Sequence, residues 1–140
     1  MRLACLDDGK PDAVRSKDAG GTSVAVDPAG DILLTGEVLH FGTASSIEAT
    51  KIHPSGAKVW VTQIPATGKI VSDSTGNVFV AGFGFVITKL SSRGAVLFTS
   101  SPLPGDAVTD AIVDPFNNLL VTGDGVNAQF NYDIFTVRLT

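Results

Sequence analysis

The chain has 140 residues and a mass of 14.5 kDa, which is enough for one domain with a buried core. Its content of 44% hydrophobic and 17% charged residues excludes a disordered chain. With a formal net charge of −4 and scattered basic residues, the chain lacks the positive footprint of proteins that bind nucleic acid or anionic membranes. No apolar run approaches the roughly 18 residues of a membrane span, so we expect neither nucleic acid nor a membrane as a partner.

The first residues, Met1-Arg2-Leu3-Ala4-Cys5, are similar to the end of a bacterial lipoprotein signal. No apolar segment of about 7–15 residues precedes Cys5, so we expect no signal peptide in this chain. The localisation stays open, with the cell envelope or exterior as options if the chain is a fragment. Cys5 is the single cysteine, which excludes an intrachain disulfide and makes a small buried side chain its expected role.

One phrase is written three times along the chain, at residues 26–36, 72–82 and 113–123. Each copy has an aspartate, then a turn that contains glycine or asparagine, and β-forming residues on both sides, which predicts a β-hairpin. The strand segments are apolar at consecutive positions, which is typical of strands buried on both faces. A second phrase, at residues 47–61 and 85–98, predicts another strand, turn and strand.

Each repeat therefore predicts four short antiparallel strands, and the period of 41 to 46 residues is typical of a repeat architecture. The chain ends on a third strand, whereas residues 4–10 resemble the turn before a fourth. From Gly9 to Asp27 is 18 residues, against 17 and 20 for the corresponding spacings in the other repeats. We expect one circularly offset array over residues 1–140, with units at about 20–66, 67–105, and 106–140 completed by 1–19.

These phrases resemble the bacterial β-propeller repeats of the SBBP type, which are related to NHL repeats. The endings Thr35-Gly36, Ala81-Gly82 and Thr122-Gly123 favour the SBBP type, because NHL repeats usually end this strand in Ala-Asp. The resemblance covers about residues 20–140. It implies an all-β fold of four-stranded blades around a central channel, with one blade often closed by strands from both termini.

Three blades are fewer than the four to eight of a closed propeller. They would leave two large apolar faces uncovered, which soluble monomers rarely tolerate. We expect the chain to be half of a six-bladed ring made with a second copy of itself, as a homodimer. The alternative is that the remaining blades belong to a longer chain.

No residue pattern predicts a catalytic centre, a cofactor or a metal. His40 and His53 lie 13 residues apart in different loops, without the close pairing of a zinc motif. The recurring aspartates suggest calcium, but turn chemistry accounts for them, and the carboxylate spacing of a calcium loop is missing. The glycine pairs after the second strands lack the strand-to-helix context of a nucleotide site.

The loops between second and third strands are long in the first and third units, and long loops on one rim commonly carry binding. We therefore predict a non-catalytic scaffold or binding module that presents rim loops to a protein or a carbohydrate. The alternative is a ligand-binding, hydrolase or lyase propeller whose site forms in the channel on oligomerisation. The candidate binding residues are Glu37, His40, Phe41, Asp124, Asn127, Gln129, Asn131 and Tyr132.

Overall fold

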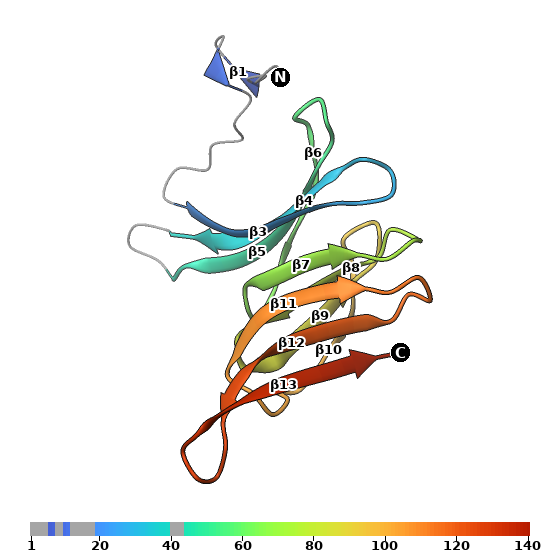
Figure 1. Ribbon diagram of the computed structural model, residues 1–140. Coiled ribbons are helices and arrows are strands. Elements are labelled where there is room, and N and C mark those ends of the chain that lie inside the picture. The colour runs from blue at the N-terminus through green and yellow to red at the C-terminus, as the bar shows by residue number, and fades with distance from the viewer. Residues whose placement is uncertain (1–5, 8–9, 12–18, 40–43) are drawn as a thin grey trace.

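The computed structural model describes residues 6–7, 10–11, 19–39 and 44–140, and over these residues the protein is all-β (Figure 1). Its helical content is the 3₁₀ turn η1, so no described helix is long and apolar enough to cross a membrane. The elements are β1 (Leu6–Asp7), β2 (Lys10–Pro11), β3 (Ala19–Val26), β4 (Ile32–Val38), β5 (Ser46–Ile52), β6 (Lys58–Gln63), β7 (Gly68–Ser72), β8 (Val78–Gly82), η1 (Phe83–Phe85), β9 (Val86–Leu90), β10 (Val96–Thr99), β11 (Ala107–Val113), β12 (Leu119–Val126) and β13 (Tyr132–Leu139).

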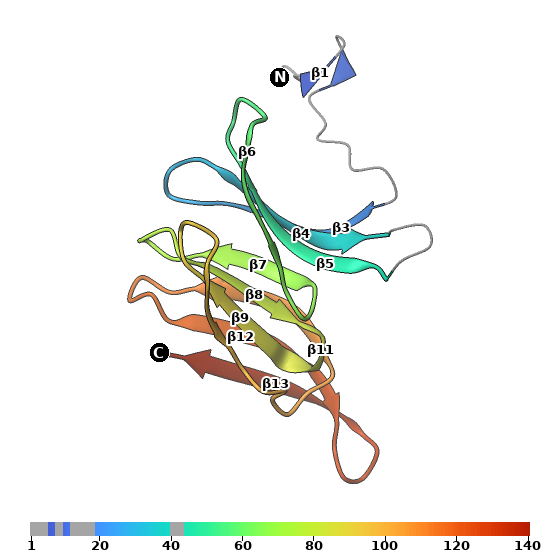
Figure 2. The ribbon, with the colours of Figure 1, turned by 180° about the vertical axis from the view of Figure 1, so that it is seen from behind.

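The main body consists of three antiparallel sheets, each ordered as its strands occur in the sequence. Sheet 1 is β3-β4-β5-β6, sheet 2 is β7-β8-β9-β10, and sheet 3 is β11-β12-β13. Figures 1 and 2 show sheet 2 between the other two, with sheet 1 and sheet 3 at the two ends of the stack. The predicted all-β fold and its repeated antiparallel meanders are confirmed.

Sheet 3 has three strands within the described chain, whereas sheets 1 and 2 have four. The edge of β13 that faces away from β12 is paired with no described strand. The short strands β1 and β2 pair with each other, through Leu6 with Pro11 and Asp7 with Lys10. Both views place this small hairpin beyond sheet 1, at the far end of the molecule from β13.

Six turns of the described chain share one five-residue geometry. In each, the first N–H donates to the fifth carbonyl, the fourth N–H donates back to the first carbonyl, and the fourth residue has a positive φ. The side chain of the first residue accepts hydrogen bonds from the backbone N–H groups that follow it. This is a type I turn closed by a left-handed residue, which suits short hairpin loops. The turns are 27–31, 53–57, 73–77, 91–95, 114–118 and 127–131.

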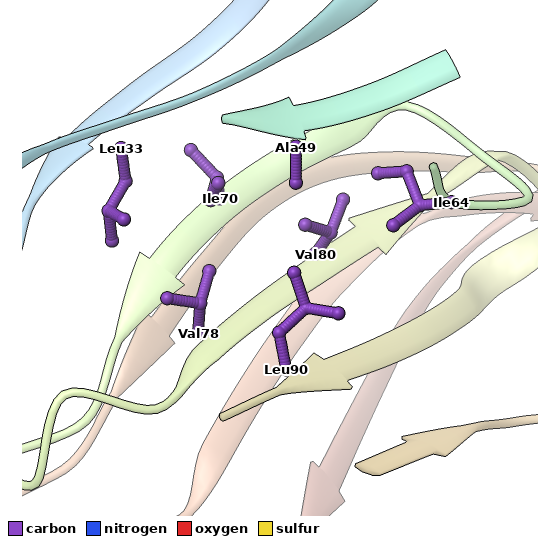
Figure 3. Close-up of a cluster of buried hydrophobic side chains, with 7 residues drawn as sticks. All are labelled: Leu33, Ala49, Ile64, Ile70, Val78, Val80 and Leu90. Carbon is purple, nitrogen blue, oxygen red and sulfur yellow. The ribbon is translucent and has the colours of Figure 1, made fainter. Parts of the chain in front are cut away.

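Two apolar clusters hold the three sheets together. The first lies between sheets 1 and 2, where Leu33 and Ala49 meet side chains of β7, β8 and β9 (Figure 3). The second lies between sheets 2 and 3 and includes the fully buried Phe85. Each cluster combines side chains from two sheets, so the sheets stabilise one another.

Burial on both faces, predicted for the repeated strand segments, holds for β8 alone among the second strands. All five residues of β8 are buried, because sheet 2 is covered by a sheet on each side. Strands β4 and β12 instead alternate between buried and half-exposed positions. For these two strands the prediction was wrong in the single chain, since sheets 1 and 3 each have a neighbouring sheet on one face only.

Phe130 occupies the left-handed position of the 127–131 turn, with φ 61°, where the corresponding residue in four of these turns is glycine. An L-residue pays about 1–2 kcal/mol for this conformation, and the side chain is 88% exposed, so little packing offsets the strain. We expect Phe130→Gly to raise the free energy of unfolding by up to about 1 kcal/mol in urea denaturation. Gln129→Gly is the matched control, and it should lower the free energy of unfolding. If the Phe130→Gly variant were the less stable of the two, this prediction would be wrong.

Candidate functional site

The side chains of the recurring aspartates accept hydrogen bonds within the hairpin turns. Asp73 is 3% exposed and its Oδ1 accepts hydrogen bonds from the backbone N–H groups of Thr75 and Asn77, both at 2.9 Å. The Asn77 side-chain amide donates to Asp73 Oδ2. Burial raises the pKa of Asp73, but the side chains of Asn77 and Thr75 and these N–H groups outweigh it and hold the pKa below its usual value. Asp73 thus remains an ionised acceptor of the turn.

Asp114 repeats this arrangement at the surface of sheet 3. The Asn118 amide, followed by the backbone N–H groups of Asn118 and Phe116, lowers the pKa of Asp114. Arg138 Nη2 lies 3.7 Å from Asp114 Oδ2. No group of three or more His, Cys, Asp and Glu residues in the described part of the chain is arranged to hold a metal ion.

Asp27 differs from its two counterparts because it has a buried cation. Lys51 Nζ donates to Asp27 Oδ2 and lies 3.1 Å from Asp31 Oδ2. Burial would raise the pKa of Asp27 and lower that of Lys51. The hydrogen bonds and charges of the cluster reverse both tendencies, so the pKa of Asp27 is lowered and that of Lys51 is raised. The cluster fixes the first turn onto β5, and we assign it a structural role.

The hairpins place the chain's loops on two rims. The turn rim holds the turns 27–31, 53–57, 73–77, 91–95 and 114–118. The loop rim, at the opposite strand ends, holds η1 and the 127–131 turn (Figure 1). His53 lies exposed on the turn rim, and its Nδ1 accepts a hydrogen bond from Ser55 N.

The predicted binding residues divide between the loop rim and the neighbouring sheet faces. Asn127 and Asn131 close the 127–131 turn, and Asn127 Oδ1 accepts hydrogen bonds from the N–H groups of Gln129 and Asn131. Gln129 is exposed at the tip. Tyr132, 75% exposed, opens β13 beside this turn.

Two other candidates lie on strands, away from the tip of the rim. Glu37 is an exposed residue of β4 beside the hollow described below, and Asp124 is a half-buried residue of β12 opposite Ile134. His40 and Phe41 lie outside the described residues. The structure therefore groups Asn127, Gln129, Asn131 and Tyr132, and it places Glu37 and Asp124 apart from them on two different sheets.

Sequence reasoning missed two highly exposed aromatic side chains among the described residues of the loop rim. Phe83, in η1, is 76% exposed and Phe130 is 88% exposed. A sequence signal for Phe130 existed: Asn127 and Asn131 have the spacing of the aspartate turns, so residue 130 takes the place of their glycine.

The outer faces of sheets 1 and 3 each carry a hollow. The hollow on sheet 1 has a volume of about 580 Å³ and is lined by three glycines, Gly20, Gly21 and Gly36, together with apolar and charged side chains of β3 to β6. The hollow on sheet 3 measures about 190 Å³ and lies over Ile112, Leu120 and Thr122. Around both hollows, large apolar side chains face outward, among them Val24 on sheet 1 and Ile134 on sheet 3.

No protein-family model matches this chain, and neither does any curated protein sequence. Among solved structures, the chain is similar to a protein of unknown function from Bacteroides caccae, with a TM-score of 0.56 and 14% sequence identity. The match covers 89% of this chain and 47% of that chain, so this chain spans about half the length of its solved neighbour. At this identity the likeness shows the fold alone.

Proposed function

We propose that the chain is a non-catalytic binding module built of SBBP-type β-propeller repeats, and that its loop rim binds a protein or a carbohydrate. The observation that carries this proposal is the pair of aromatic rings on the loop rim, Phe83 and Phe130, which stand exposed at the ends of well-packed strands. Exposed aromatic side chains are the usual anchors of recognition surfaces. A rigid sheet beneath them reduces the ordering cost of binding.

The proposal treats each sheet as one propeller blade. Support comes from the repeated sequence phrases and from the shared strand order, in which each unit runs outward from its first strand. The first strands lie next to one another, as in the hydrogen bond from Ile70 N on β7 to Ser23 Oγ on β3. A closed propeller needs further blades, supplied by a second copy of the chain or by the remaining blades of a longer chain.

The state of the recurring aspartates supports a scaffold over an enzyme. A general acid or base works best with a pKa near the operating pH, whereas the pKa values of Asp27, Asp73 and Asp114 are all lowered by turn hydrogen bonds. The polar residues that the repeat retains are thus engaged in holding hairpins.

The test is binding of the unmodified chain to a panel of oligosaccharides and peptides, followed by variants. For a ligand found in the panel, we expect Phe83→Ala or Phe130→Gly to weaken binding at least tenfold. Phe116→Ala is the matched control, because Phe116 is 83% exposed but lies on the turn rim. Loss of binding in the Phe116 variant alone, or no binding to any panel member, would count against the proposal.

A further inference from the structure

The two interfaces between sheets use the same positions of the repeat. For each sheet we call the side toward the next sheet along the chain the forward face, and the opposite side the back face. The back faces of sheets 2 and 3 contribute Val80 and Val121, which are the same residue of the repeated phrase. The forward face of sheet 2 contributes Phe79, Phe85 and Val71. The chain therefore contains one kind of interface, made twice.

The outer face of sheet 3 is its forward face and carries the corresponding apolar positions. Ile112 and Leu120 correspond to Val71 and Phe79 of sheet 2. Ile134, four residues before Arg138, corresponds to Phe85, four residues before Lys89. Ile112 and Ile134 are 57% and 86% exposed, although their counterparts are packed in the second cluster.

The outer face of sheet 1 is its back face and likewise matches a buried face. Val24 and Leu34 correspond to Ile70 and Val80, and they lie opposite each other on β3 and β4. Ile70 and Val80 are almost fully buried in the first cluster, whereas Val24 is 69% exposed. The two ends of the stack are thus the two halves of the interface that the chain already makes internally.

The shape of the interface is complementary as well. Within the chain, the Phe85 ring lies against Gly123, where a Cβ atom would come within 2.8 Å of the ring. Gly36 holds the position of Gly123 in sheet 1, and it lines the hollow of about 580 Å³ together with Gly20 and Gly21. A side chain at the position of Phe85 therefore has a matching hollow on sheet 1, and Ile134 is that side chain on sheet 3.

We propose that the forward face of sheet 3 docks onto the back face of sheet 1 of a second copy, with Ile134 entering the glycine-lined hollow. Two copies placed head to tail make this contact twice. Both outer sheet faces of each chain are then covered, and the assembly is closed with two-fold symmetry. This docking rests on the proposed function, because it assumes that each sheet is a propeller blade. The partner that supplies the further blades is then a second copy of the chain.

The test introduces one aspartate on the outer face of sheet 3 in one variant, and one on the outer face of sheet 1 in another. Ile134→Asp and Val24→Asp each change a highly exposed side chain, so both variants should fold. At a concentration where the unmodified chain is a dimer, native mass spectrometry should find each variant monomeric. An equimolar mixture should recover a heterodimer, because one of its two interfaces is then intact. Phe116→Asp should remain dimeric, as should Ile134→Phe, which installs the counterpart residue.

The other outcomes overturn the docking. A dimeric Val24→Asp beside a monomeric Ile134→Asp would mean that sheet 3 pairs with sheet 3, and the reverse would mean that sheet 1 pairs with sheet 1. Dimers in both variants, or a monomeric unmodified chain, would exclude this contact. A monomer that still binds its panel ligand through the loop rim would refute the docking alone, whereas a dimer without such binding would refute the proposed function alone.

Discussion

Phe85→Ala is expected to lower the free energy of unfolding by about 3–5 kcal/mol, the range for truncating a fully buried aromatic ring. The Phe85 side chain is 0% exposed and lies against Gly123 of sheet 3 and Gly105 in the connection that leads into β11. Removing the ring leaves a cavity between sheets 2 and 3 that the glycines cannot fill. Alanine keeps the Cβ atom, so the backbone strain at φ 51° is unchanged and the loss reports packing.

The matched control for this substitution is Phe83→Ala. Phe83 lies two residues earlier in η1 and is 76% exposed, so its truncation should change the free energy of unfolding by less than about 0.5 kcal/mol. Urea denaturation, monitored by circular dichroism, measures the free energy of unfolding of both variants. Equal losses in the two variants would show that Phe85 does not hold sheets 2 and 3 together.

Lys51→Met is expected to lower the free energy of unfolding by about 3 kcal/mol at neutral pH. The substitution leaves the nearly buried Asp27 carboxylate without its cation, which is the costly way to break a buried ion pair. Because the pKa of Asp27 is lowered in the folded chain, its contribution is present above its unfolded pKa and is lost as the pH falls. The difference between Lys51→Met and the unmodified chain should therefore narrow below about pH 4.

Lys89→Met is the control for the cation, because Lys89 is the counterpart of Lys51 in sheet 2. Lys89 Nζ lies 4.8 Å from the centroid of the Phe79 ring, a cation–π contact worth about 0.5–1 kcal/mol. Thermal unfolding across a pH series measures both variants. A deficit in Lys51→Met that stays constant from neutral to acid pH would contradict the assigned role of the ion pair.

The hairpin turns could be predicted from the sequence because their signals are local. Asp73, Gly76 and Asn77 act within five residues, and the structure uses them as the pattern predicts. The 127–131 turn was missed as a turn because Phe130 stands where the pattern calls for glycine. The sequence predicts binding roles for Asn127 and Asn131, whereas in the structure the side-chain oxygen of Asn127 accepts the hydrogen bonds that close the turn.

Contacts between distant segments could not be predicted from the sequence. Nothing in the local pattern brings Lys51 to Asp27 rather than to solvent, since that choice depends on how β5 lies beside β4. The apolar runs of β4 and β12 predict burial on both faces of each strand. In the single chain only one face of each strand is covered by a neighbouring sheet. Leu34 and Leu120 have their counterparts buried in sheet 2, so the pattern is that of an interior sheet.

The proposed docking joins the outer face of sheet 3 of one copy to the outer face of sheet 1 of the other. The most direct test is the mass of the unmodified chain in solution, measured by light scattering over a range of concentrations. Docking of two copies predicts about twice the chain mass of 14.5 kDa, independent of concentration above the dissociation constant. A folded chain that stays at 14.5 kDa throughout that range would contradict the claim.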